Sequence, residues 1–267
     1  MSLAKYSSGK VKLSGCLIVL ALLLFVAASG FYFLTKSVRE AKQLETTLNE
    51  RFSTASNYVP NADGSISAER VEVFVAVREK TQTVCASYQG VLDTIISINE
   101  LDKKEDVSRE DVEAAGLHSI GEVFSAGSKM VEFTQVRNQA LLDNNMGLGE
   151  YMNIYLSAYA RQLAGETETR YSEMDEAFIT KRSRADFVQI LSNQLDQLSA
   201  QDSLAAVLQD EIESMQNDTQ RSAWSNGLPA STAASLKPFQ AQLAALYCSG
   251  IVKIELLQKN SGLNFDG

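Results

Sequence analysis

Hydrophobic positions divide this chain into one unbroken apolar segment near its start and a long remainder in which apolar residues recur every three or four positions. The apolar segment, residues 13–34, carries no charge between Lys12 and Lys36. A helix of this length, rising about 1.5 Å per residue, roughly matches a hydrocarbon core about 30 Å thick. Aromatic residues 31–33 suit the membrane interface at its far end. The pattern therefore predicts a single transmembrane helix.

Two processing signals compete with this interpretation. Residues 13–16 spell Leu-Ser-Gly-Cys, as in a bacterial lipoprotein signal, but the apolar run follows Cys16 where such a signal needs it before the cysteine. The small residues 26–28 loosely fit an ordinary cleavage site. Because the apolar run continues to Leu34, the sequence favours a retained anchor.

The charges that flank the segment bear on its orientation. Lysines alone precede the segment, whereas lysine, arginine and glutamate are mixed after it, so Lys and Arg counts give almost a tie. Amino-terminal signal anchors generally leave the amino terminus in the cytoplasm. We therefore expect an inner (cytoplasmic) membrane protein that crosses once, with its bulk extracytoplasmic, in the periplasm if the source is bacterial.

Beyond the anchor, the hydrophobic period is helical, and the only prolines are Pro60, Pro229 and Pro238. The predicted fold is all-α, with the transmembrane helix followed by an extended antiparallel helical bundle. The expected parts are a cytoplasmic tail (1–12), the anchor (13–35), a helical stalk (36–57), the extracytoplasmic bundle (58–260) and a frayed tail (261–267).

Local start and stop signals give the expected helices. Ser67 is a good N-cap for a helix that begins at Ala68. The slip in hydrophobic phase at residues 199–203 fits either a stutter or a tight break. The helices are expected near 37–56, 68–100, 108–142, 150–183, 184–200, 204–215 and from Leu236 or Pro238 to Leu257.

Charge narrows the range of partners. The chain has 24 basic and 33 acidic residues; the first 34 residues hold three lysines and no acid, so the remainder has 21 basic and 33 acidic residues and a net charge of −12. An acidic surface repels phosphate backbones, which disfavours nucleic acid as a partner.

Most catalytic and metal-binding patterns are missing. His118 is the sole histidine, so Ser-His-Asp triads and multi-histidine metal sites cannot be completed. Residues 61–66 imitate the middle of a calcium-binding loop, but the alignment puts Val59 and Arg70 where the terminal carboxylates belong. No phosphate loop, Cys-x-x-Cys pair or Gly-x-Ser-x-Gly elbow is present. We predict no enzyme activity, no cofactor and no metal.

Two cysteines lie in the polar remainder. Cys85 and Cys248 fit either one disulfide, plausible in an oxidising compartment, or two buried free thiols. Sequence alone leaves both alternatives open, because it does not give the distance between their Cα atoms.

Aromatic residues supply the remaining candidate site. Tyr151, Tyr155 and Tyr159 follow at four-residue steps and so share one helix face. Such a stripe either packs in a core or grips a ligand or partner. Trp224, in the turn-rich residues 217–232, is either an anchor for a partner or part of a small cluster beneath a loop.

These features favour a membrane-anchored, non-enzymatic helical scaffold or accessory subunit that contacts another membrane or periplasmic protein, or a second copy of itself. The alternative is a helical-bundle sensor domain that binds a small molecule or peptide at the tyrosine stripe. A tethered enzyme would need a catalytic set built from carboxylates, tyrosine or serine.

Overall fold

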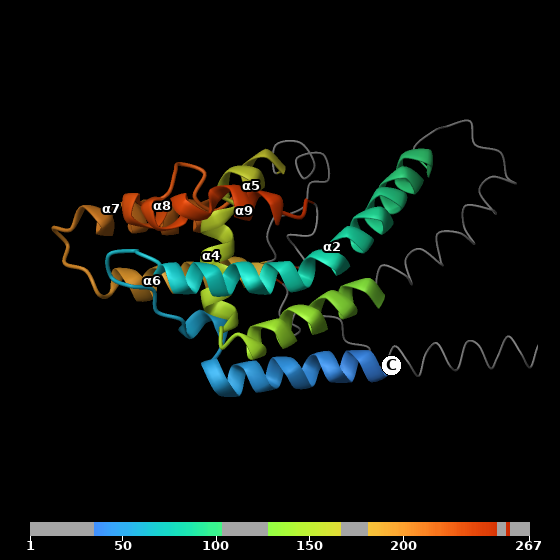
Figure 1. Ribbon diagram of the computed structural model, residues 1–267. Coiled ribbons are helices and arrows are strands. Elements are labelled where there is room, and N and C mark those ends of the chain that lie inside the picture. Colours follow the sequence, from blue (N-terminus) through green and yellow to red (C-terminus); the bar gives the residue numbers. More distant parts are fainter. Residues whose placement is uncertain (1–34, 103–127, 167–180, 250–254, 257–267) are drawn as a thin grey trace, which may run out of the picture. The chain divides into compact units, whose positions relative to one another are not determined.

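The computed structural model of the protein describes residues 35–102, 128–166, 181–249 and 255–256 (Figure 1). The chain divides into two compact units, Met1–Glu40 and Ala41–Gly267. All regular elements of the described residues are helices, which confirms the all-α class. No helix among these residues has the length and apolar character needed to cross a membrane. Residues 13–34 of the expected anchor lie outside the described part of the chain.

The helix that precedes the first turn contributes to the core of the second unit. Residues 35–52 are helical, and the helix stops where Ser53 adopts a left-handed backbone with φ +65°. Leu48 is 2% exposed and belongs to the main hydrophobic cluster. Residues 41–52 are therefore part of the same compact unit as the later helices. The short 3-10 helix η1, Ala55–Asn57, follows.

Helix α2, Ala68–Asp102, begins at the predicted residue. The Ser67 hydroxyl accepts the Arg70 N–H at 3.3 Å, as expected of an N-cap. Val77, Thr81 and Val84, spaced four and three residues apart on one face of α2, are buried. Of the next predicted helix, residues 128–143 are helical and the earlier part lies outside the described residues.

Helix α4, Leu148–Ala158, is the central helix of the second unit. Nine of its eleven residues are buried, and a helix covered all round in this way lies inside a bundle. A Cβ at position 149 would collide with the carbonyl oxygen of Ala55, so Gly149 allows α4 to approach η1 closely. The predicted long helix is interrupted at Tyr159, and α5, Ala160–Glu166, continues after it.

Helices α6, Lys181–Leu195, and α7, Ser203–Asn217, pack against each other, and α6 also contacts η1 and α4. The phase slip at residues 199–203 is a tight break. Asp202 caps α7 with a carboxylate that accepts the Leu204 N–H at 3.0 Å.

Three amide side chains, at the end of α6 and in the turn after it, hold the loop that precedes α2. Asn193, Gln194 and Gln197 donate hydrogen bonds of 2.8 to 3.1 Å to backbone carbonyl oxygens in residues 56–61. We call these three residues the amide row. It satisfies loop carbonyls that would otherwise be partly buried without a partner.

The predicted start of the last helix was wrong. Helix α8, Ala230–Leu236, begins directly after Pro229, and η3, Lys237–Phe239, and α9, Gln240–Ala245, follow it. The Ser231 and Thr232 hydroxyls donate to carbonyl oxygens of residues 63 and 64, so distant contacts stabilise this early start. The helix also ends at Ala245, where the pattern predicted continuation to Leu257.

Cys85 and Cys248 form a disulfide, with their Cα atoms 6.2 Å apart. Both cysteines are buried in a small cluster with Val84 and Phe133. The bond joins α2 to the segment after α9 and closes a loop with a sequence separation of 163.

We expect the Cys85→Ser and Cys248→Ser variants to be less stable than the parent by about 5 kcal/mol in the chain-entropy model, because the closed loop is long. Urea unfolding measures this difference. Thiol labelling of the denatured, unreduced chain provides a control: it should find one reactive thiol, Cys16, and three after reduction. Three reactive thiols before reduction would contradict the bond.

Candidate functional site

An ion pair lies at the centre of the second unit. The guanidinium of Arg78, on α2, is 2.6 Å from the carboxylate of Glu255, and both side chains are 0% exposed. The same guanidinium donates to the Tyr151 hydroxyl at 3.1 Å and to the Leu246 carbonyl oxygen at 2.9 Å. Such extra hydrogen bonds offset part of the large penalty for removing two charges from water.

Further polar groups hold the segment that carries Glu255. The Tyr151 hydroxyl donates to the Glu255 carboxylate, and the Arg137 guanidinium donates to the Glu255 backbone carbonyl oxygen. The Ser183 hydroxyl donates to the carbonyl oxygen of Leu256 at 2.8 Å. Together with Arg78, these side chains bind residues 255–256 from four different helices.

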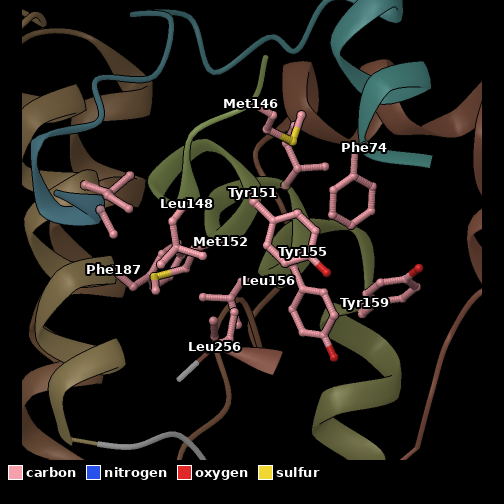
Figure 2. Packing of buried hydrophobic residues seen from close by; sticks show 14 of the residues in the cluster. Phe74, Met146, Leu148, Tyr151, Met152, Tyr155, Leu156, Tyr159, Phe187 and Leu256 are labelled. Carbon is pink, nitrogen blue, oxygen red and sulfur yellow. The ribbon is translucent and has the colours of Figure 1, made fainter. Parts of the chain in front are cut away.

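The predicted tyrosine stripe surrounds this ion pair. Figure 2 shows Tyr151, Tyr155 and Tyr159 side by side among buried apolar residues, and all three are 0% exposed. Adjacent ring centroids are 6.0 Å and 5.0 Å apart, and the Arg78 guanidinium lies 5.3 Å from the Tyr155 centroid and 5.5 Å from that of Tyr159. These distances are typical of aromatic and cation–π contacts. The stripe offers no surface to a partner in this structure.

Burial dominates the proton equilibria of this cluster. Removal from water raises the pKa of the Tyr151 and Tyr155 phenols well above 10.0, although the nearby charge of Arg78 opposes the shift. Burial also acts to lower the pKa of Arg78, but Glu255 and the neighbouring tyrosines outweigh it and the net pKa is raised. The guanidinium therefore stays charged and the phenols stay neutral.

Sequence reasoning missed both members of the ion pair, although a signal was present. Arg78 is next to Val77 and three residues before Thr81, on the buried face of α2, and Glu255 lies between two apolar residues, Ile254 and Leu256. A charged residue on a buried helix face needs a partner of opposite charge, because it is not stable there alone. The pairing was not predicted because the two residues are far apart in the sequence.

A third buried arginine, Arg184, lies at the carboxyl end of α7. The Arg184 guanidinium donates to the carbonyl oxygens of Met215, Asp218, Thr219 and Arg221 at 2.7 to 3.0 Å. A cation at a helix carboxyl end satisfies unpaired carbonyls and interacts favourably with the helix dipole. Burial lowers the pKa of Arg184. The loop after α7 is thereby held in a defined path.

Trp224, the other predicted aromatic site, lies in that loop. Its backbone has φ +59°, an uncommon value for a bulky residue. The Glu211 carboxylate, 3% exposed, accepts the Trp224 backbone N–H at 2.6 Å and a hydrogen bond from Arg221 at 3.2 Å. The indole packs edge-on against Phe187, 6.1 Å between centroids, and is 4% exposed. A buried carboxylate thus fixes an unusual loop conformation.

The α7 face and this loop enclose a hollow of about 330 Å³, which we call the α7 hollow. Val207, on its wall, is 43% exposed; the other exposed large hydrophobic side chain among the described residues is Val59. The residues that line the hollow are Ala206, Val207, Asp210, Glu211, Trp224, Asn226 and Gly227.

Metal-binding arrangements do not occur in the described residues: no three His, Cys, Asp or Glu side chains gather there to hold an ion. Asp63, in the segment that imitates a calcium loop, accepts hydrogen bonds from the Ser65 N–H and hydroxyl, and the backbone hydrogen bond in particular lowers its pKa. This is the geometry of an ordinary turn. His118 lies outside the described residues.

Comparison of the chain with protein-family models, with curated proteins and with solved structures gives no match. Its function must therefore be inferred from its own residues.

We expect the Arg78→Met variant to lose about 3 to 5 kcal/mol of unfolding free energy, because it leaves Glu255 buried without its partner. Adding Glu255→Leu should restore part of this loss, because the pair is then replaced by apolar side chains. Urea unfolding measures both. A matched control is Lys129→Met at the partly exposed Lys129–Glu132 pair, where we expect a change within about 1 kcal/mol. Equal losses at the two sites would contradict the analysis.

The buried phenols also predict how stability depends on alkaline pH. Below the ordinary tyrosine pKa of 10.0, Tyr151 is protonated in both the folded and the unfolded chain and contributes no slope. Above that pH the unfolded chain releases the proton and the folded chain keeps it, so the free energy of unfolding falls by up to about 1.4 kcal/mol per pH unit. Urea unfolding above pH 10 should give a shallower decline for Tyr151→Phe than for the parent. Identical slopes would argue against the raised pKa.

Proposed function

We propose that the chain is a membrane-anchored, non-enzymatic helical scaffold or accessory subunit that binds another protein outside the cytoplasm. The observation that supports this proposal is that the buried charged side chains form structural contacts. All five buried charged side chains of the described residues bind structural partners: Arg78, Arg137, Arg184, Glu211 and Glu255. Groups engaged in this way are not available as acids, bases or nucleophiles, whereas the α7 hollow exposes apolar surface to a partner.

The apolar residues 13–34 support the membrane part of the proposal. Their length and lack of charge suit one span, and the acidic remainder is poorly suited to anionic lipid or nucleic acid. Residues 5–12 contain lysine and no acidic residue, and we propose that this side of the span faces the cytoplasm. The helical unit would then be available to proteins of the extracytoplasmic space.

A second candidate is a sensor domain, favoured by one observation. The volume of the α7 hollow, about 330 Å³, is at the lower end of the roughly 300 to 1,000 Å³ common for small-molecule sites. A ligand there would touch Trp224, while the tyrosine stripe would act only as core.

To test the scaffold proposal, the full-length chain is extracted from membranes in mild detergent after crosslinking. We expect one protein to co-purify in stoichiometric amount and the chain to resist alkaline extraction of the membranes. Stabilisation by a small molecule, with no partner recovered, would favour the sensor.

A variant with Leu23→Arg and Leu24→Arg serves as the control for the anchor. Each central arginine opposes insertion by about 2.5 to 3.5 kcal/mol, so this variant should be released by alkaline extraction. Release of the parent chain would contradict the anchor.

A further inference from the structure

Among the described residues, exposed apolar surface, a fixed wall and negative charge coincide at the α7 hollow. We propose that the α7 hollow is the docking site for a segment of the partner protein in which an apolar side chain is flanked by lysine or arginine. This inference rests on the proposed function, and it specifies which surface is used and what chemistry it recognises.

The apolar part of the site is formed by α7. Ala206 and Val207 are consecutive residues on its exposed side, and Val207 is one of only two large hydrophobic side chains exposed in the described part of the chain. Apolar surface that lies in a concave site gains free energy when a side chain of a partner covers it. The hollow therefore fits an apolar side chain better than a polar one.

The negative charge around the hollow determines which partner residues can flank that apolar side chain. Asp210 lines the hollow, and Glu213 is exposed one turn further along α7. Helix α7, Ser203–Asn217, contains no lysine or arginine, and Arg221 in the following loop is paired with the buried Glu211. A positively charged segment is complementary to this potential, and an acidic one would be repelled.

The wall of the hollow is preorganised. Glu211 binds the backbone N–H of Trp224, and the indole packs against Phe187 on α6. Arg184 holds the carbonyl oxygens of the same loop. A site that is already ordered loses little conformational entropy when a partner binds, which favours a rigid docking site over an adaptable loop.

Trp224 provides a direct test, because it is the only tryptophan in the chain and lines the hollow. The probe is an end-blocked peptide, Gly-Ser-Lys-Leu-Lys-Ser-Gly, titrated into the detergent-solubilised full chain while the tryptophan emission is recorded. Control peptides replace the lysines by glutamate or the leucine by serine. We expect a saturable change in emission, an affinity at least tenfold higher than for either control, and weakening as salt is added.

Variants localise the binding. Val207→Ser removes the apolar contact and Asp210→Asn removes the charge; each should weaken the lysine peptide several-fold. Val59→Ser is the matched control, since Val59 is also exposed but does not line the hollow, and it should leave the affinity unchanged. All three positions are exposed, and thermal unfolding confirms that each variant is folded.

The possible failures are distinguishable. If a protein co-purifies with the chain but no peptide changes the Trp224 emission, the docking site is wrong and the proposed function stands. Preference for the glutamate peptide would overturn the charge argument. Self-association that Val207→Ser abolishes would make a second copy the occupant and overturn the inference. Absence of any co-purifying protein would count against the proposed function itself.

Discussion

The interior of the second unit depends on the Arg78–Glu255 ion pair. It connects α2 with residues 255–256, and Tyr151 brings the central helix α4 into the same contact. Apolar side chains of equal volume would often stabilise a core as well as such a pair does. The pair adds selectivity, because a charge placed in the core has few acceptable positions, and we infer that it specifies which segments meet around α4.

Buried charged side chains also fix the backbone of the loop that follows α7. Glu211 and Arg184 are buried, and each forms hydrogen bonds with the backbone of the loop that contains Trp224. The loop therefore holds its left-handed tryptophan without a stretch of regular structure. Charged residues of the interior thus hold the backbone in place, and under the proposed function a partner would bind at the α7 hollow, whose wall they support.

Sequence reasoning succeeded where the cause was local. Ser67 predicted the start of α2, because a cap acts over a few residues. A change of hydrophobic phase located the irregularity before Ser203 and left open whether it was a stutter or a break. Sequence reasoning failed at α8, whose early start relies on carbonyl groups of residues 63 and 64, and at the pairing of Arg78 with Glu255. The α7 hollow could not be predicted from the sequence for the same reason, since it forms only when the Trp224 loop folds back on α7.

The amide row at the end of α6 differs from the ion pairs in that it carries no charge. Asn193, Gln194 and Gln197 neither gain nor lose protons, and dissolved ions do not screen their hydrogen bonds as they screen ion pairs. The row therefore does not titrate, and its hydrogen bonds are the same at any pH and ionic strength at which the unit is folded. The attachment of residues 56–61 thus rests on contacts that changes in acidity or salt do not alter.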